Sequence, residues 1–235
     1  MSFATTVILF DIDGTLVRAS GYQRSPMELA AFDVFGVESI PKVELGGRTD
    51  FAIFGEVVEK LGFDYSVHRT AFEEAYYRHL DNAWASGCFR EMPGMKTVLK
   101  ELSQRSVPLG LITGNAEPAA RIKLSSAGMW DHFGFGGFGR DHEHRNDVAL
   151  LALDEVKVRY RHWGDNLRVL VIGDTPADIE CARHIGAQVV AVATGGCSLA
   201  ELEKSKPDLL FADFSEPEKR LDEITQILAR GTNVL

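Results

Sequence analysis

The chain has 235 residues, of which 45% are hydrophobic and 25% are charged, and its formal net charge is -9 at pH 7. This is the composition of an ordinary globular protein, and the length allows one sizeable core with a smaller second unit. The negative charge argues against a nucleic acid as partner, because an extended phosphate backbone requires a basic surface. It does not exclude a small phosphate ester, which a metal ion and a few local cations can hold.

The three cysteines, Cys88, Cys181 and Cys197, are far apart and match neither a zinc site nor a disulfide framework. We interpret them as thiols of a reducing compartment. No apolar run approaches the ~20 residues that span a bilayer, and the first residues lack a basic leader with a cleavage site. We therefore expect a cytoplasmic protein without membrane contact. The sequence is silent on its oligomeric state.

Short apolar runs recur along the chain and predict the buried strands of a parallel sheet. These runs are Thr6–Phe10, Pro108–Ile112, Arg168–Ile172, Ala187–Val192 and the weaker Asp208–Phe211. Helical periodicity lies between them, around residues 95–102 and 148–160. Another helix is predicted to begin at Pro176, with Thr175 as N-cap and Gly186 as its end. The alternation predicts an open, parallel, Rossmann-like α/β sheet flanked by helices, with its ligand site at the carboxyl ends of the strands.

The region from residue 17 to residue 92 breaks this alternation and contains no convincing strand. Its predicted helices are Pro26–Phe35, Asp50–Leu61 and Ser66–Ala85. A Pro-Gly pair then marks the return of alternating strands and helices. We therefore expect an α/β core formed by residues 1–16 and 93–235, with a helical domain of residues 17–92 inserted after the first strand.

Two carboxylates follow the first predicted strand. Asp11 and Asp13 lie two residues apart in the sequence DIDGTL, and Gly14 allows the chain to turn sharply after them. Clustered carboxylates suit Mg²⁺, which prefers oxygen ligands. A calcium loop would need further acidic residues and a glutamate, which the following sequence LVRASGYQ lacks.

Polar residues also follow two later predicted strands. Thr113, Gly114 and Asn115 offer a hydroxyl and free backbone N–H groups to an anion at the start of a helix. Asp174 follows the third run, and Asp178 lies in the first turn of the next helix. Ordinary helix capping also explains most of these residues, but it gives no role to Asp174.

Several carboxylates and a phosphate in one cleft repel each other, so we expect a cation beside them. Arg140 and Arg145 both precede the helix around residues 148–160, and we favour Arg145 because it lies at the helix entrance. His142 and His144 have no carboxylate or cysteine at a recognised metal-ligand spacing, so we interpret them as parts of an exposed loop.

DIDGTL, LITGN, a basic residue near the start of the next helix, and VIGDTPAD occur in this order along the core. Together they resemble the four signature motifs of the haloacid dehalogenase-like hydrolases. The inserted region resembles the helical cap of the phosphoglycolate phosphatase and β-phosphoglucomutase type. The resemblance implies a Mg²⁺-dependent phosphatase that acts on a small phosphorylated metabolite through a covalent aspartyl-phosphate.

The resemblance also implies roles for the four aspartates. Asp11 would be the nucleophile, and its carboxylate would also bind Mg²⁺. Asp13 would protonate the leaving alcohol and then activate the hydrolytic water, while its backbone carbonyl ligates the metal. Asp174 would complete the metal site, and Asp178 would support it. These roles agree with phosphoryl-transfer chemistry, which needs positioning and charge stabilisation.

By the same resemblance, Thr113 and the backbone N–H groups that follow it, at Gly114 and Asn115, would bind the phosphoryl oxygens. Arg145 would neutralise the nucleophile and the phosphate. The family more often has lysine at this third motif, and an arginine can hold phosphate bidentately. Arg140 stays the second candidate for this position.

Arg48, in the sequence GGRTD, lies where caps of this type carry a specificity loop. One interpretation is that Arg48 contacts the non-phosphate end of the substrate, and phosphoglycolate is one possible substrate. The other is that it is a plain surface arginine.

Four other interpretations fit the sequence less well. Dehalogenating and phosphonoacetaldehyde-cleaving relatives lack an aspartate at the position of Asp13. A sugar phosphomutase keeps both aspartates but has a histidine soon after the first motif, and residues 17–23 contain none. A retired enzyme that only binds a phosphometabolite would be expected to have lost a nucleophile or a metal ligand.

Overall fold

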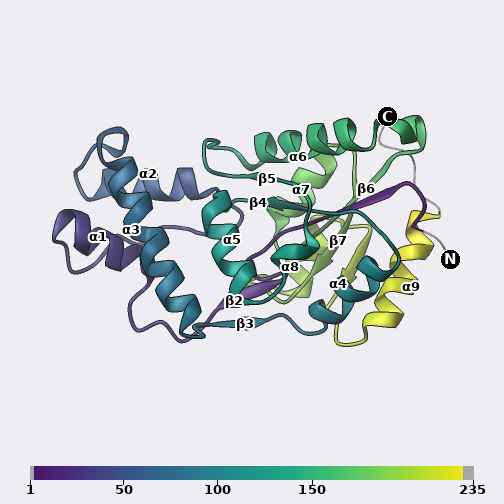
Figure 1. Cartoon of the computed structure of the whole chain (residues 1–235), viewed down its shortest axis with the longest axis horizontal. Helices are drawn as coiled ribbons and strands as arrows, with labels where there is room; N and C mark the ends of the chain where they lie inside the picture. The colour runs from purple at the N-terminus through teal and green to yellow at the C-terminus, as the bar shows by residue number, and fades with distance from the viewer. Residues whose placement is uncertain (1–2, 230–235) are drawn as a thin grey trace.

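The computed structural model describes residues 3–229, and its centre is a six-stranded sheet with the order β5-β4-β1-β6-β7-β8 (Figure 1). All neighbouring strands in it are parallel. Its strands are β1 (Thr6–Phe10), β4 (Leu109–Thr113), β5 (Gly136–Phe138), β6 (Arg168–Gly173), β7 (Gln188–Val192) and β8 (Leu209–Phe211). The predicted fold class is confirmed, and each predicted strand forms with its ends shifted by at most one residue.

Strand β5 is the member of the sheet that the sequence did not predict. It is three residues long and contains Gly136 and Gly137, and glycine is depleted in strands because it offers no side chain to pack. Its pairing with β4 defines it, and that pairing is not visible in the local sequence.

Helices cover both faces of the sheet. The side chains of β1 alternate between two apolar clusters, with Ile8 and Phe10 in one and Val7 and Leu9 in the other. The first cluster includes α4 (Met95–Gln104), α5 (Glu117–Ser126) and α9 (Pro217–Leu228). The second includes α6 (Arg145–Arg159), α7 (Pro176–His184) and α8 (Leu199–Lys204). Two short 3₁₀ helices, η1 (Trp130–His132) and η2 (Arg161–Asn166), complete the core.

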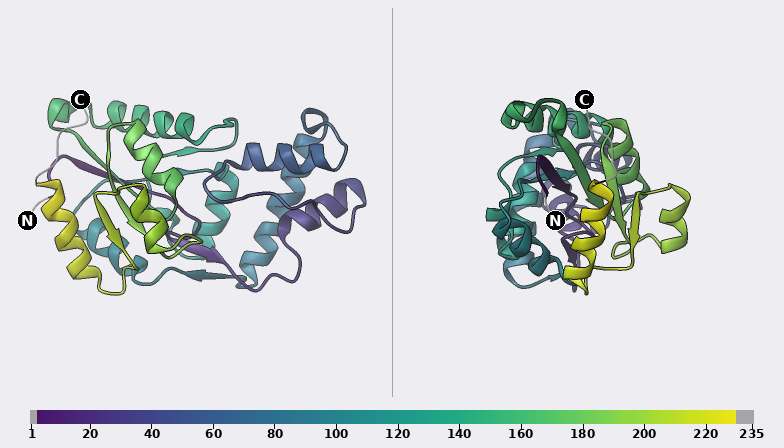
Figure 2. Two further views of the ribbon diagram at one scale, coloured as in Figure 1. Left: turned by 180° about the vertical axis from the view of Figure 1, so that it is seen from behind. Right: turned by 90° about the vertical axis from the view of Figure 1, so that its right-hand side faces the viewer.

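Three helices lie beside the sheet rather than on either face, at its carboxyl edge (Figures 1 and 2). We call this group the cap, and it consists of α1 (Pro26–Phe35), α2 (Asp50–Lys60) and α3 (Tyr65–Ala85). The three helices match the predicted ones within one residue. An aromatic cluster that includes Phe35, Phe54 and Phe72 packs between them.

The prediction that residues 17–92 contain no strand is wrong. Strands β2 (Val17–Ala19) and β3 (Phe89–Glu91) pair antiparallel at the two ends of this region. Each strand has three residues and is largely exposed, so neither has the buried apolar run that identifies a strand in the sequence. The predicted division into a core and an inserted domain stays a prediction. Within residues 3–229 no helix is both long and apolar enough to cross a membrane.

The start of α2 is attached to the core at the loop after β4. The backbone N–H of Asp50 donates to the Gly114 carbonyl at 2.7 Å, and the Asp50 carboxylate accepts from the Ala116 N–H at 2.8 Å. Asp50 is buried, and burial raises the pKa of its carboxyl to about 6, although nearby Lys123 opposes the shift. A side chain at Gly114 would overlap the Arg48 carbonyl oxygen, so glycine is required where the two segments approach.

We expect Gly114→Ala to lower the free energy of unfolding by about 1–3 kcal/mol, because overpacking forces backbone shifts. Urea denaturation followed by circular dichroism measures this change. The matched control is Gly134→Ala, whose added methyl group would meet nothing within 4 Å. Equal stability of the two variants would show that the cap segment moves aside freely.

Candidate active site

The carboxyl ends of β1, β4 and β6 bring the predicted site residues together. The register places Phe10 beside Leu111 on one side and Ile172 on the other. Asp11 continues β1, and its backbone N–H donates to the Ile172 carbonyl at 2.9 Å. Gly14 then turns the chain with a φ of 88°, and a Cβ there would lie 2.5 Å from an Asp174 carboxylate oxygen. The turn at Asp13 and Gly14 therefore also makes room for the Asp174 carboxylate.

Asp11, Asp174 and Asp178 form a buried acidic cluster. Each is at most 4% exposed, and one carboxylate oxygen from each lies within 4.8 Å of the others. Arg145, the first residue of α6, brings the neighbouring positive charge. Its Nη2 donates to Asp11 Oδ1 at 2.7 Å and to Asp178 Oδ1 at 2.5 Å.

Burial raises the pKa of both the Asp11 and the Asp174 carboxyl groups, and the Arg145 guanidinium opposes the shift. The acidic neighbours raise these pKa values further, since Asp178 lies close to both groups. Three carboxylates thus lie near one guanidinium, which contacts Asp11 and Asp178 directly, and a further positive charge at this place would favour their ionised forms.

The donor set fits a divalent cation with a preference for oxygen ligands. Asp11 accepts from Arg145 through Oδ1, and Asp174 accepts from Thr15 through Oδ1. Within residues 3–229, no side chain donates to Oδ2 of either aspartate. Asp178 uses both oxygens, because Oδ2 accepts from the backbone N–H of Asp174 and from Thr175. Asp11 and Asp174 are therefore free to bind an ion, and Asp178 is placed to support them.

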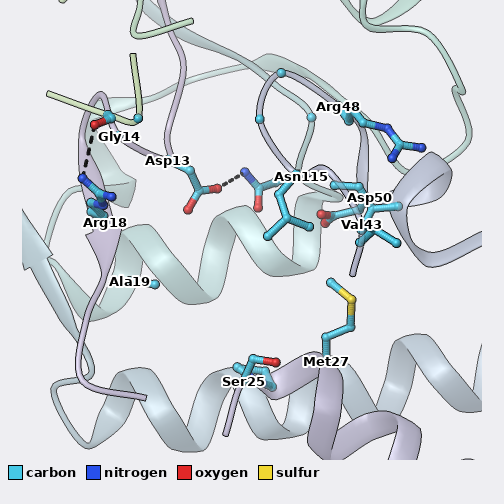
Figure 3. Close-up of a pocket in the computed structure, with 18 of the residues that line it drawn as sticks. Asp13, Gly14, Arg18, Ala19, Ser25, Met27, Val43, Arg48, Asp50 and Asn115 are labelled. Atoms are coloured by element: carbon cyan, nitrogen blue, oxygen red, sulfur yellow. Dashed lines mark hydrogen bonds between the residues drawn. The ribbon is translucent and has the colours of Figure 1, made fainter. Parts of the chain in front are cut away.

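The Asp13 carboxylate lies in a separate polar group. Its Oδ2 accepts from Asn115 Nδ2 at 2.7 Å (Figure 3). It also accepts from Lys123 Nζ at 2.6 Å, and Lys123 donates to Asn115 Oδ1 at 2.7 Å. Asn115 Nδ2 donates in addition to the Thr113 hydroxyl oxygen at 2.8 Å. The loop after β4 thus fixes the position of Asp13. Asn115 and Gly114 line the cavity at this site, whereas Thr113 is fully buried.

Lys123 is a site residue that was not predicted from the sequence. A lysine in a helix is usually a surface residue, yet Lys123 is only 7% exposed. One signal was available: Ala119, Ala120 and Leu124 form the buried face of α5, and Lys123 belongs to that face by its spacing.

The two candidates for the third-motif cation lie in different places. Arg145 contacts Asp11, as described above. Arg140 instead pairs with Glu73 of α3, with 3.5 Å between Nε and Oε2. The geometry therefore favours Arg145 for this position.

Arg48 lines the same cavity, but its charge is paired within the cap. Nη1 donates to Glu56 Oε2 at 2.5 Å and to the Glu44 carbonyl at 3.0 Å, and Nη2 donates to the Ala52 carbonyl at 3.3 Å. The guanidinium points away from Asp13 (Figure 3). These contacts disfavour Arg48 as the group that binds a substrate carboxylate.

A cavity of about 850 Å³ connects the two polar groups with the cap. Asp11, Asp13, Asp174 and Arg145 line its core side, and residues of α1, α2 and α3 line the opposite side. The site can therefore hold an anion beside a cation and enclose the rest of the ligand against the cap.

Comparison with known proteins gives one family match. Residues 8–192 match the profile of the family described as Haloacid dehalogenase-like hydrolase. A protein named phosphoglycolate phosphatase from Yersinia pseudotuberculosis is 25% identical over 223 residues, which cover 89% of this chain and 90% of that protein.

Two solved structures share the fold. A crystal structure described as a predicted phosphoglycolate phosphatase from Haemophilus somnus 129pt has a TM-score of 0.69 at 19% identity, with 94% of this chain and 99% of that chain covered. The β-phosphoglucomutase from Clostridium difficile has a TM-score of 0.67 at 15% identity, with 97% and 100% covered. At these identities the likeness is one of fold.

We expect Asp174→Asn to stabilise the metal-free protein at pH 8 by about 1–2 kcal/mol, because it removes a buried carboxylate with a raised pKa. Because burial raises the pKa of the folded-state carboxyl to about 9, the gain should fade only as the pH falls toward about 4, where the unfolded chain also takes up the proton. Mg²⁺ should raise the melting temperature of the original protein, since it binds the folded state, and should leave that of the variant unchanged.

Differential scanning calorimetry with Mg²⁺ and with chelator measures both effects. Asp154→Asn is the matched control, because Asp154 is exposed on α6. Loss of stability in Asp174→Asn, or an undiminished Mg²⁺ effect, would contradict the assignment of Asp174 to the ion site.

Proposed function

The chain belongs to the haloacid dehalogenase-like hydrolase family, and from that premise we propose that it is a Mg²⁺-dependent phosphatase acting on a small phosphate ester. The observation that carries the proposal is the buried Asp11 carboxylate, bound by Arg145 through one oxygen and adjacent to Asp174. A carboxylate is a weak base but a serviceable nucleophile toward phosphorus when it is held in position. The relatives named phosphatases support the same activity.

In the first half-reaction, an Asp11 oxygen attacks phosphorus in line with the leaving oxygen. The bond between phosphorus and the alcohol oxygen breaks, and its electron pair stays on that oxygen. Asp13 then donates a proton to the same oxygen. In the second half-reaction, Asp13 takes a proton from water, and the water oxygen attacks the aspartyl-phosphate. The bond between phosphorus and Asp11 then breaks, so that phosphate leaves and the carboxylate is restored.

The surrounding groups stabilise charge during these steps. Mg²⁺, when held by Asp11, Asp174 and the Asp13 backbone carbonyl, supplies positive charge beside the transferring phosphoryl group. Arg145 neutralises the nucleophile. The N–H of Gly114, which lines the cavity, is the first proposed ligand of the phosphoryl oxygens. The Thr113 hydroxyl is the second, and it would have to leave its contact with Asn115 to reach them. We propose that this chemistry takes place in the cytoplasm, without nucleic acid or membrane as partner.

We expect Mg²⁺-dependent phosphate release from a panel of small phosphomonoesters, and a loss of at least about 10³-fold in Asp11→Asn, because the nucleophile is removed. Malachite-green detection of phosphate, with Mg²⁺ and with chelator, measures the release. Asp154→Asn again serves as control and should keep full activity.

Two results would contradict the phosphatase proposal. Conversion of a hexose 1-phosphate to its 6-phosphate without net phosphate release would indicate a phosphomutase. Silence in both assays, with the Mg²⁺ effect on stability retained, would indicate a protein that binds a phosphometabolite without turning it over.

We further propose that Lys123 is a positioning residue, which holds Asp13 beside the leaving oxygen together with Asn115. Lys123→Met keeps the length of the side chain and removes its charge. We expect a loss of about 10- to 100-fold in kcat for an alkyl phosphate, whose leaving group needs a proton, and less than about threefold for p-nitrophenyl phosphate, whose leaving group does not.

Steady-state kinetics on the two esters measures this difference, and Lys123→Arg should restore part of the alkyl phosphate activity. Lys100→Met, at an exposed position of α4, is the control. Equal losses on both esters would show that Lys123 acts on the phosphoryl charge and not through Asp13.

A further inference from the structure

The cap side of the cavity is mainly apolar. Met27 of α1, Val43 of the connection between α1 and α2, Ile53 of α2 and Leu80 of α3 line it, together with Ile40. Met27 and Val43 are only half-buried, and the Met27 side chain extends toward Val43 and Asp50 across the space below Asn115 (Figure 3). Leu45, at the edge of the same cavity, is 55% exposed. These apolar residues line the same cavity as the acidic site, and we call the cap side of this cavity the wall.

Most charged groups of this wall are already bound within the protein. Arg48 pairs with Glu56, and the Glu28 carboxylate accepts from the Ser25 hydroxyl and backbone N–H as a helix cap. Arg18 donates to the Gly195 carbonyl. A carboxylate bound here would therefore find few free charged partners, and among the described side chains of this wall the free neutral donors are the hydroxyls of Tyr22 and Tyr76. Further polar groups of a sugar would stay unpaired, and unpaired buried polar groups are costly.

One charged side chain of the wall has no such contact. Among the described residues that line the cavity from the cap, Lys42 is the charged one without a polar partner, and it is exposed. An exposed lysine stays hydrated and leaves the apolar part of the wall intact. The wall therefore favours a ligand that is apolar next to the phosphate, and Lys42 leaves room for a polar group only at the far end.

We propose that the substrate is the phosphomonoester of an alcohol with an apolar alkyl or aryl body of about six or more carbons. The phosphate occupies the end at Asp11, and the apolar body covers Met27, Val43 and Ile53 when it binds. The proposal rests on the proposed phosphatase activity. It is supported by the continuity of the acidic site with the apolar wall, and by a cavity of about 850 Å³, which a two-carbon ester such as phosphoglycolate leaves mostly empty.

The test uses linear alkyl phosphates from ethyl to octyl, because their leaving groups are chemically alike and differ only in apolar length. We expect kcat/KM to rise about two- to fourfold with each methylene up to about six carbons, as apolar surface is buried. Propyl phosphate should also exceed glycerol 3-phosphate and phosphoglycolate by about tenfold or more, since these carry polar groups onto the same wall.

Two variants connect the chain-length effect with this wall. Met27→Gln and Val43→Thr nearly preserve side-chain shape while adding polarity, so each should reduce the gain per methylene. Val67→Thr is the matched control, because Val67 is 71% exposed on α3 outside the cavity, and it should keep the original gain.

Three outcomes overturn the inference in distinguishable ways. Phosphate release without a chain-length gain, with the polar esters preferred, would leave the phosphatase activity intact and refute the apolar substrate. An undiminished gain in both wall variants would place the apolar site elsewhere. If no ester is hydrolysed, calorimetric titration with the series from ethyl- to octylphosphonate measures binding alone. An affinity that rises with chain length then supports the apolar site, and a constant or absent affinity refutes it.

Discussion

The guanidinium of Arg145 makes it possible for three carboxylates to lie buried at one edge of the sheet. Without a cation, Asp11 and Asp178 would be like charges in a poorly hydrated place, and removal of one partner from a buried ion pair is strongly destabilising. With it, Asp11 keeps one oxygen bound and one oxygen unbound by side chains. The same residue ties the start of α6 to the end of β1 through Asp11 and to the first turn of α7 through Asp178. The position of the helix, the geometry of the acidic cluster and the free oxygen of the proposed nucleophile therefore depend on one residue.

The loop after β4 connects the chemistry with the cap. Asn115 binds Asp13 from one side, while the neighbouring Gly114 accepts from Asp50 at the start of α2. A shift of this loop would therefore move the proposed proton donor and the cap segment together. The buried Lys123 strengthens the connection, because its ammonium group joins Asp13 to Asn115. Motions of the cap over the cavity are thus expected to act on a polar group that is already held on the core side.

The parts that the sequence predicts well are local. A buried strand followed by an aspartate can be recognised from neighbouring residues, and this identified Asp11 and Asp174 at one sheet edge before their distance was known. The contact of Lys123 with Asp13 and the pairing of β2 with β3 could not be found in this way, because each joins residues that lie 70 or more positions apart. Arg48 shows the opposite difficulty. One of its two interpretations from the sequence placed it beside the substrate, but the charge of Glu56 eight residues later decides what its guanidinium contacts.

The antiparallel pairing of β2 and β3 has a consequence for how this chain can change. Val17 lies opposite Glu91, so the two ends of the intervening region leave the core as neighbours. A region that begins and ends at nearly the same point can be lengthened, shortened or exchanged without altering the register of β1 or the turn at Gly14. The parallel sheet and its acidic edge can thus persist through the history of the chain while the wall opposite them is replaced as a unit.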